Sequence, residues 1–365
     1  MKKQKIIISC GGTGGHIFPA IEIAKSLQRL DSNLDILFIG ALNRMEMKTI
    51  PKQGFPIIGL WIQGLHRKSI LKNVLFPLKL AISLIHALLL IIYYRPIAVI
   101  GTGGFASGPI LFIASLIGLK TYIQEQNCFA GLTNKLLSKR VDQIFVAHDG
   151  MQKFFPNNKI TNYGNPVRQS LKKESSLDFT AKSREFFSLS HNKFTVLVVG
   201  GSLGAEPINK AIDKHLKTLI EDDIQLIWQT GEHEYHKYCH LNSNNCSVNK
   251  FIDRMDLAYA ASDLILSRAG AIVIAEISFL SKASILIPSP HVSDDHQAEN
   301  AQYLKTNNAC MLVVEKNLMT QELIDNIRRL QDHSIRQQIG ENANQLFHYD
   351  AANNIAKDIL KDKKC

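Results

Sequence analysis

The sequence lacks any paired-cysteine motif. Its six cysteines are dispersed, and no two of them stand in a CxxC spacing. This distribution argues against zinc-ribbon and disulfide frameworks and favours a reduced, cytosolic protein. No secretory signal follows the basic start MKKQK, and no low-complexity tract is present. We therefore expect a globular protein that retains free thiols at Cys10, Cys128, Cys239, Cys246, Cys310 and Cys365.

Signatures of nucleic-acid, ATP and NAD binding are also missing. The 365 residues carry 42 basic and 32 acidic side chains, a formal net charge of +10. This balance suits an anionic membrane surface or a phosphorylated substrate, whereas no RNA-binding motif, zinc finger or helix-turn-helix pattern supports nucleic acid as a partner. No G-K-[ST] follows any glycine run, and no G-x-G-x-x-G with a suitably spaced acidic residue occurs. The sequence thus argues against both an ATPase and a dehydrogenase.

Two glycine loops are the strongest local signals. The stretch ISCGGTGGHIFPAIEIAKSL predicts a strand, a glycine loop and a helix with Pro19 in its first turn. Such a loop suits a phosphate, although a tight turn without a ligand is the alternative for one isolated copy. A second copy, KFTVLVVGGSLGAEPINKAI, favours two nucleotide-fold domains. The apolar faces expected on the two helices are Ile17, Ile21, Ala24 and Leu27, and Ile208, Ile212, Leu216 and Leu219.

Strand and helix patterns alternate along the whole chain. This order predicts an α/β protein with parallel sheets covered on both faces, in two Rossmann-like domains that face a central cleft. We expect domains at 1–165 and 166–341, a turn-rich hinge within 162–176, and a helix in 342–365 that packs back on the first domain. The expected strands are 6–9, 35–39, 97–100, 121–124, 143–146, 195–199, 225–229, 248–252, 264–266, 284–287 and 311–314.

An apolar segment at 73–96 is nearly long enough to cross a bilayer. Lys79, His86 and Pro77 interrupt it, and a strand follows at once. We expect a helix buried on one side that offers apolar side chains and a basic rim to a membrane surface. A wholly buried helix and a transmembrane span are the alternatives. The residues expected to face the membrane are Leu75, Phe76 and Leu80, with Lys68, Lys72 and Lys79.

Several side chains could carry chemistry. Glu276, on a helix expected to begin near Ala271, can accept hydrogen bonds from ribose hydroxyls, and Arg168 can pair with a diphosphate. His16 beside the first loop and Glu125 after a strand are both candidates for a general base. The histidines and cysteines of 236–246 match no zinc spacing, and the consecutive residues 294–296 cannot converge on one ion. We therefore expect no metal site.

In chain order, the motifs GGTGGHIFPA, RME, GTGGFASGP, EQNCFAGLTNK, GNPVR, GGSLGA, FIDRM, GAIVIAE and DDHQAENA resemble those of the MurG family. Members transfer N-acetylglucosamine from UDP-GlcNAc to undecaprenyl-diphosphate-linked muramyl-pentapeptide, lipid I, and form lipid II in peptidoglycan synthesis. The resemblance covers nearly the whole chain. It implies a GT-B fold, an inverting reaction without a cofactor or nucleotide-bound metal, and a peripheral enzyme on the cytoplasmic face of the inner membrane, with cell-wall synthesis proteins as possible partners.

The resemblance also assigns site residues. The acceptor diphosphate is expected at Gly14, Gly15, Gly103 and Gly104. Val273 and Leu203 depart from the family's usual Thr and Gln, and Gln124 and Phe105 from its frequent His and Tyr. The implied contacts of UDP-GlcNAc are Thr13, Gly14, Gly15, Asn127, Arg168, Ser202, Ile252, Ala271, Ile272, Val273, Ile274, Ala275, Glu276 and Gln297.

Three other functions fit parts of this pattern. Another GT-B enzyme could make a different glycolipid, and a membrane scaffold could bind a nucleotide sugar without turnover. An NAD-dependent oxidoreductase agrees least with the glycine spacing. In the preferred interpretation, the acceptor 4-hydroxyl attacks the anomeric carbon of the donor, and His16 or Glu125 takes its proton.

Overall fold

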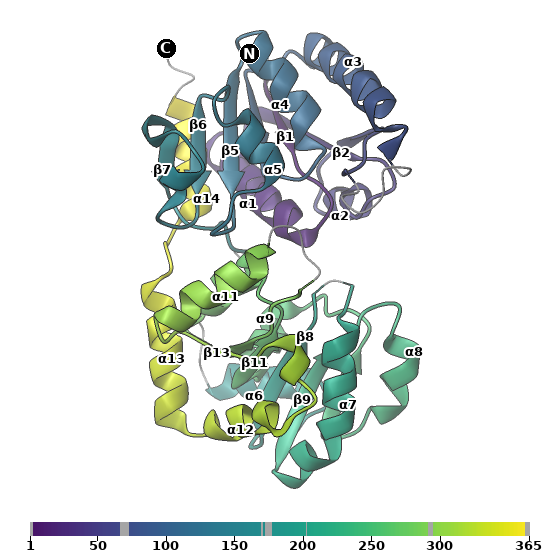
Figure 1. The fold of residues 1–365 in the computed structure, drawn as a ribbon, viewed down its shortest axis with the longest axis vertical. Coiled ribbons are helices and arrows are strands. Elements are labelled where there is room, and N and C mark those ends of the chain that lie inside the picture. Colours follow the sequence, from purple (N-terminus) through teal and green to yellow (C-terminus); the bar gives the residue numbers. More distant parts are fainter. Residues whose placement is uncertain are drawn as a thin grey trace. The chain divides into compact units, whose positions relative to one another are not determined.

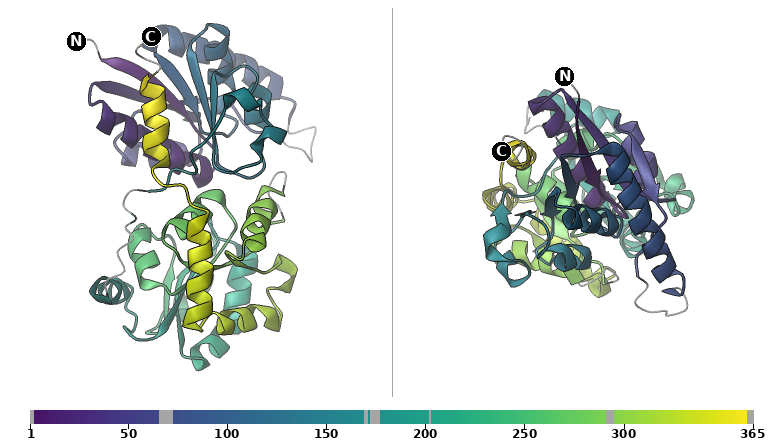
Figure 2. Two further views of the ribbon diagram at one scale, coloured as in Figure 1. Left: turned by 90° about the vertical axis from the view of Figure 1, so that its left-hand side faces the viewer. Right: turned by 90° about the horizontal axis from the view of Figure 1, so that it is seen from above.

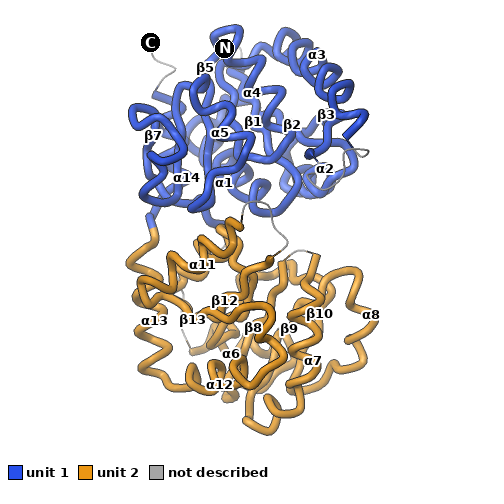
Figure 3. Tube along the Cα trace, viewed as in Figure 1, with its two compact units in different colours: residues 1–168, 348–365 blue, residues 169–347 orange. Residues whose placement is uncertain are grey.

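The computed structural model describes residues 3–65, 73–168, 171, 177–201, 203–290 and 295–361. The chain divides into two compact units, and the chain passes between them twice (Figures 1 and 3). Unit 1 comprises residues 1–168 and 348–365, and unit 2 comprises residues 169–347. The first crossing falls inside the polar segment 162–176. The second crossing follows α13 (His333–Gln345), so that Asn342 lies within a helix of unit 2.

Unit 1 is built on a seven-stranded sheet in the order β3-β2-β1-β4-β5-β6-β7, and its paired strands are parallel. The two faces of β1 bury alternate residues, with Ile6 and Ile8 in one core and Ile7 in the other. Helices therefore cover both faces. The elements are β1 Gln4–Ser9, α1 Gly14–Leu30, β2 Leu34–Ala41, α2 Glu46–Lys52, β3 Ile57–Leu60, α3 Phe76–Tyr94, β4 Ala98–Gly101, α4 Ser107–Leu116, β5 Lys120–Glu125, α5 Leu132–Leu137, β6 Gln143–Val146, β7 Ile160–Asn162 and α14 Ala351–Lys361.

Unit 2 repeats this arrangement around a six-stranded parallel sheet in the order β10-β9-β8-β11-β12-β13. The helix after the second glycine loop, α7, buries the four apolar residues expected of it. The elements are α6 Leu177–Phe186, β8 Phe194–Val199, α7 Glu206–Glu221, β9 Ile224–Gln229, α8 Tyr235–Tyr238, β10 Cys246–Asn249, α9 Met255–Ala261, β11 Leu264–Ser267, α10 Ala271–Phe279, β12 Ala283–Leu286, α11 His296–Thr306, β13 Met311–Leu312, α12 Gln321–Arg329 and α13 His333–Gln345.

The C-terminal segment completes the core of unit 1. Helix α14 packs against α1, and Ile355, Ala356 and Ile359 join the same apolar cluster as Ile6 and Ile8. The Tyr163 hydroxyl, just after β7, donates a 2.6 Å hydrogen bond to Asp358. Figure 2 shows α14 in yellow along this unit. Residues more than 180 positions apart in sequence thus share one core.

Most of the expected strands are present, and the differences have local causes. The expected strand 248–252 is instead β10, Cys246–Asn249, because the ladder with β9 ends at the pair Asn249 and Gln229. Beyond that point, the Gln229 side chain rather than a neighbouring strand accepts the hydrogen bond of Ile252 N. The sequence analysis missed β3 and β7, which are edge strands of four and three residues without a long apolar run.

The position predicted for Pro19 was wrong. Helix α1 begins at Gly14, inside the glycine loop, and Pro19 is therefore in the helix interior rather than in its first turn. Having no N–H, Pro19 cannot donate to the carbonyl of Gly15, and one helical hydrogen bond is lost. The Pro19 side chain is buried, so packing offsets part of that loss.

Helix α3 is buried on one side only, as the sequence predicted. Its buried residues, Ser83, Ala87 and Ile91, are spaced four apart and form a narrow stripe. By length and composition this helix could cross a membrane, and only 17% of its apolar window is buried. Two of the apolar side chains expected to face the membrane, Phe76 and Leu80, are partly covered. The leucine and isoleucine side chains of α3 that are more than half exposed are Leu78, Ile85, Leu89 and Ile92, and Tyr93 is exposed as well.

The basic rim expected beside α3 is only partly visible. Lys68 and Lys72 lie outside the described residues. Lys79 is directed back into unit 1, where its ammonium donates to Gln63 at 2.6 Å and lies 5.3 Å from the ring centroid of Trp61. Leu75, just before the helix, is 53% exposed.

His148 makes the stability of unit 1 depend on pH. Burial, together with repulsion from His348 of the C-terminal segment, lowers the pKa of His148 to about 4, although Gln126 and Asp149 oppose this shift. As pH falls from about 6.5 to about 4, the unfolded chain binds a proton that the folded chain does not, so the free energy of unfolding decreases. We expect His148→Gln to remove up to about 3 kcal/mol of this decrease, measured by urea unfolding between pH 7 and 4.

The exposed His233 provides the control, because His233→Gln makes the same chemical change but leaves His148 in place, so its pH dependence should match that of the wild type. An unchanged pH dependence in His148→Gln would contradict the assignment.

Candidate functional site

The glycine loops of unit 1 lie where the strand order reverses. Strands β1 and β4 are neighbours in the sheet although about ninety residues separate them, and the following loops leave the sheet on either side of that junction. In open parallel sheets, ligands bind outside the carboxyl ends of the strands at this point. The first loop, 10–13, follows β1, and the loop 102–106, which contains Gly103 and Gly104, follows β4.

The two loops approach each other at backbone distance. A Cβ atom placed on Gly104 would lie 2.3 Å from the carbonyl oxygen of Gly11. One placed on Gly103 would lie 2.7 Å from Nδ1 of His16. The absence of side chains at these positions therefore allows the two loops and His16 to form one compact surface.

The N-terminus of α1 is open to an anion. Thr13 is its N-cap, and the Thr13 carbonyl accepts hydrogen bonds from the backbone of His16 and Ile17. The Thr13 side chain makes no capping hydrogen bond, and the first turn contains no acidic residue. The N–H groups of Gly14 and Gly15 belong to the helix start and have no carbonyl four residues earlier within the helix. Together with the helix dipole, they suit a phosphate oxygen.

His16 is held in one orientation by the loop after β4. Its Nδ1 lies 2.9 Å from the Thr102 carbonyl and 3.1 Å from Oε1 of Gln126. The Gln126 amide nitrogen itself donates to Thr102, which leaves Oε1 as the acceptor toward His16. Because both partners of Nδ1 are oxygen acceptors, Nδ1 carries the proton and Nε2 is the basic nitrogen of the neutral ring. The Thr102 hydroxyl also donates to the His16 carbonyl at 2.7 Å.

Glu125 organises the loop that follows β5. Its carboxylate is 1% exposed and accepts four hydrogen bonds. Oε1 accepts from the backbone and side-chain nitrogens of Asn127 at 3.1 and 3.2 Å. Oε2 accepts from Gly131 N at 2.9 Å and from Asn134 Nδ2 at 2.8 Å. Such a carboxylate holds the chain from Asn127 to Asn134 in place.

Arg168 lies beside the first loop. Its guanidinium carbon is 4.2 Å from the ring centroid of Phe18, on α1. The same Phe18 ring would be 3.1 Å from a Cβ on Gly14. Stacking on an aromatic ring orients a guanidinium without neutralising it. The last described residue of unit 1 before the chain enters unit 2 is therefore a cation near the open start of α1.

The second glycine loop, in unit 2, is packed differently. A Cβ on Gly204 would be 2.0 Å from the carbonyl oxygen of Thr230, in the turn after β9. Helix α7 carries Glu206 in its first turn, and Glu206 pairs with Lys210 at 2.8 Å. The close packing against Thr230 therefore requires glycine at position 204. Ser202 lies outside the described residues.

Helix α10 is the clearest helix start in unit 2. It follows β11, which lies beside β8 at the reversal of strand order in this sheet. Its N-cap, Gly270, offers no side chain, and its first turn, from Ala271 through Val273, contains no acidic residue. Val273 has no hydroxyl, so it offers only its backbone. Ile272, Ile274 and Ala275 are buried on the same helix.

Glu276 sits one and a half turns into α10, with its carboxylate buried. The hydroxyl of Tyr259, from α9, donates to Oε2 of Glu276 at 2.8 Å. The sequence analysis did not identify Tyr259, which comes from an apolar helix and carries no motif. This bond fixes the orientation of the carboxylate within unit 2.

Two further residues predicted to contact UDP-GlcNAc form hydrogen bonds within unit 2. The amide of Ile252 donates to Oε1 of Gln229 at 2.8 Å, which leaves its carbonyl for other contacts. Oε1 of Gln297, on α11, accepts from the backbone of Ser289 at 2.9 Å and so directs the amide nitrogen elsewhere. The side-chain amides of Gln229 and Gln297 thus each bind the backbone of a loop at the carboxyl edge of the sheet.

The sequence analysis also gave no role to Glu46. This residue belongs to the RME motif and opens α2, and its carboxylate is fully buried beneath the first glycine loop. The sequence did offer one sign of a role, because Glu46 lies in a motif and stands between two methionines. Only the fold places it against a loop more than thirty residues away.

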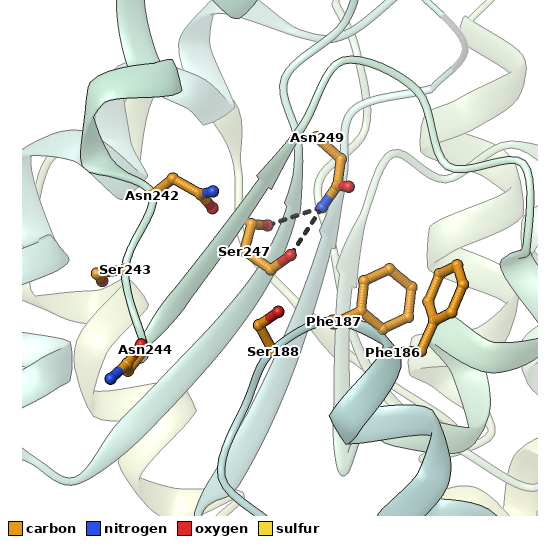
Figure 4. Close-up of a pocket in the computed structure, with 8 residues that line it drawn as sticks. All are labelled: Phe186, Phe187, Ser188, Asn242, Ser243, Asn244, Ser247 and Asn249. Carbon is orange, nitrogen blue, oxygen red and sulfur yellow. Dashed lines mark hydrogen bonds between the residues drawn. The ribbon is translucent and has the colours of Figure 1, made fainter.

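A separate cavity of about 530 Å³ lies at the edge of unit 2, beside β10 (Figure 4). It contains none of the predicted site residues. Among the described residues, no group of three or more histidine, cysteine, aspartate or glutamate side chains could hold a metal ion. The cavity is lined by Phe186, Phe187, Ser188, Asn242, Ser243, Asn244, Ser247 and Asn249.

The contact between Gly104 and Gly11 predicts a strong effect of one methyl group. Gly104→Ala should destabilise unit 1 by about 1–3 kcal/mol more than Gly118→Ala, because the new Cβ overlaps a backbone oxygen. Both glycines have positive φ, +81° and +75°, but a Cβ on Gly118 meets nothing within 4 Å. Urea unfolding of both variants provides the comparison, and equal losses of stability would contradict the proposed contact.

Comparisons with known proteins agree with this architecture. Residues 6–146 match the glycosyltransferase family 28 N-terminal domain, and residues 195–355 match the C-terminal domain of that family. A crystal structure of MurG from Acinetobacter baumannii is 27% identical, with a TM-score of 0.74, and the match covers 98% of this chain and 99% of that one.

Two bacterial relatives carry the same descriptive name, UDP-N-acetylglucosamine–N-acetylmuramyl-(pentapeptide) pyrophosphoryl-undecaprenol N-acetylglucosamine transferase. The relative from Flavobacterium psychrophilum is 42% identical over 99% of this chain and 98% of its own length. The relative from Bacteroides thetaiotaomicron is 44% identical, with the same coverage of 99% and 98%. The chain therefore belongs to glycosyltransferase family 28 and, within it, to the MurG family of GT-B glycosyltransferases.

Proposed function

We propose that this protein transfers N-acetylglucosamine from UDP-GlcNAc to the 4-hydroxyl of the muramyl sugar of lipid I and so forms lipid II. The observation that carries the proposal is the match to relatives of that name over almost the full length of both chains. The two parallel-sheet units, each with helix starts at its strand-order reversal, supply the anion sites that a nucleotide sugar and a lipid diphosphate need.

In unit 2 we assign the donor to the region around α10. The open helix start at Ala271 faces a phosphate, and Glu276, oriented by Tyr259, accepts hydrogen bonds from the ribose hydroxyls. Binding the ribose requires the buried Glu276 carboxylate to become accessible to it. The carbonyl of Ile252 and the amide nitrogen of Gln297 suit the base and the sugar.

In unit 1 we assign the acceptor diphosphate to the two packed glycine loops. The N–H groups of Gly14 and Gly15 provide hydrogen bonds, and Gly103 and Gly104 allow close approach. Arg168, stacked on Phe18, adds a fixed positive charge for diphosphate chemistry. Fixed N–H groups and a guanidinium can bind the negative charge of the acceptor's diphosphate, which keeps all its bonds in the transfer.

Between the two candidate bases, the geometry favours His16. Its Nδ1 proton is directed at Thr102, so that Nε2 is the acceptor, whereas both carboxylate oxygens of Glu125 are already engaged. In the transfer, the acceptor oxygen bonds to the anomeric carbon while the bond from that carbon to the UDP oxygen breaks. His16 Nε2 takes the hydroxyl proton, UDP leaves with the bonding electron pair, and the anomeric configuration inverts.

The exposed side of α3 supports attachment to a membrane surface. A polyprenyl-anchored acceptor keeps its diphosphate at the level of the lipid head groups. Ile85, Leu89 and Ile92 present apolar area on a helix of the same unit as the acceptor loops. We therefore propose that unit 1 binds the cytoplasmic face of the cell membrane peripherally.

The transfer reaction can be tested by UDP release with UDP-GlcNAc and a short-chain lipid I analogue. His16→Asn retains an N–H donor for Thr102 but has no basic nitrogen, so we expect kcat to fall about 10²–10⁴-fold. The affinity for UDP-GlcNAc should stay close to that of the wild type. The exposed His233→Asn is the matched control.

The alternatives predict other results. If the wild type binds UDP but does not release UDP from UDP-GlcNAc, the protein is a scaffold and the proposed transfer is overturned. A preference for diacylglycerol over the lipid I analogue would indicate a different glycolipid synthase. Full turnover by His16→Asn would remove His16 from the role of base.

The membrane proposal predicts a selective effect of charge on α3. Ile85→Glu combined with Leu89→Glu should weaken binding to anionic vesicles and lower turnover of a long-chain acceptor, because two carboxylates oppose insertion of the apolar face. Turnover of a short, soluble acceptor should be unchanged. A vesicle-flotation assay and the two acceptors measure this. The control is Leu177→Glu with Met319→Glu, two exposed apolar residues of unit 2. Equal loss with both acceptors would contradict the proposal.

A further inference from the structure

Glu46 joins the first glycine loop to β2. Its Oε2 accepts a 3.1 Å hydrogen bond from Gly12 N, and its Oε1 accepts a 3.0 Å hydrogen bond from Ala41 N at the end of β2. The residue is 0% exposed. Burying a carboxylate is costly unless its oxygens are hydrogen-bonded, and both oxygens of Glu46 have a backbone donor.

The surrounding backbone is shaped to admit this side chain. A Cβ atom on Gly11 would lie 2.7 Å from Oε1 of Glu46, and one on Gly40 would lie 2.6 Å from its Cγ. Glycines on the loop and on β2 therefore leave the space that the carboxylate fills. The side chain has little freedom to move without breaking one of its two bonds.

The bond from Gly12 has a consequence for the loop's other donors. It directs the Gly12 N–H inward, toward Glu46, whereas the N–H groups of Gly14 and Gly15 belong to the open start of α1. Gly11 also forms the contact with Gly104 in the loop after β4. One side chain thus sets the conformation of the loop on which both the helix start and the packing of the two loops depend.

We propose that Glu46 is a positioning residue that holds the first glycine loop in the conformation that binds the acceptor's diphosphate. This inference rests on the proposed function for its ligand. The two backbone donors require two acceptor oxygens. A glutamine of the same size offers one oxygen and one NH₂ group, so one of the two backbone N–H groups would face another donor.

Glu46→Gln therefore tests the proposal, with Glu22→Gln as its control. Glu22 is also buried in unit 1, on the helix that follows the loop, but its carboxylate pairs with Lys25 at 3.4 Å. We expect hydrogen–deuterium exchange of the peptide 10–15 to rise at least tenfold in Glu46→Gln. By calorimetry, the Kd for a short-chain lipid I analogue should rise at least tenfold, and the Kd for UDP-GlcNAc, which we assign mainly to α10 of unit 2, should rise by a smaller factor.

Glu46→Asp retains two acceptor oxygens on a shorter side chain and should show intermediate exchange and affinity. It also serves as the test if Glu46→Gln does not fold. Wild-type exchange or acceptor affinity in Glu46→Gln, or equal effects of Glu22→Gln, would overturn the proposal. So would wild-type behaviour of Glu46→Asp if Glu46→Gln is unfolded. Wild-type protein that binds the acceptor analogue without releasing UDP would overturn the proposed function and not this inference.

Discussion

The contact on which the site in unit 1 depends is the approach of two backbones without side chains between them. Gly104, after β4, lies against the carbonyl of Gly11, after β1. Because the parallel strands β1 and β4 are adjacent, their loops emerge side by side, and only glycine lets them touch. His16, the start of α1 and the ring of Phe18 under Arg168 all take their positions from this junction.

Unit 2 meets the same topological constraint with different chemistry. Its glycine loop is closed against the turn after β9, where Gly204 lies on Thr230. The open helix start belongs instead to α10, after the neighbouring strand β11. Two sheets of the same design thus place their accessible backbone N–H groups after different strands. This difference suits two ligands that both carry a sugar diphosphate but differ at its other end, a uridine in the donor and a polyprenyl chain in the acceptor.

Buried carboxylates contribute to the local structure of both units. Glu125 gathers four donors from one loop, Glu46 ties a loop to β2, and Glu276 is oriented by the hydroxyl of Tyr259. The hydrogen bonds that these carboxylates accept offset part of the cost of removing a charge from water. A glutamate in a sequence motif can therefore serve to hold the backbone in place, as Glu125 and Glu46 do, rather than to act on the substrate.

The sequence by itself determined the fold class, the positions of most strands along the chain, the glycine loops and the one-sided helix α3. These follow from local patterns, such as β-branched runs, glycine clusters and helical periodicity, that depend on neighbouring residues. Tertiary structure decided which candidate residues come together. It engages both oxygens of Glu125 while leaving Nε2 of His16 as an acceptor, and it buries Glu46 against Gly12 across thirty-four positions. It also revealed β3 and β7, because the pairing of short edge strands leaves little trace in local sequence.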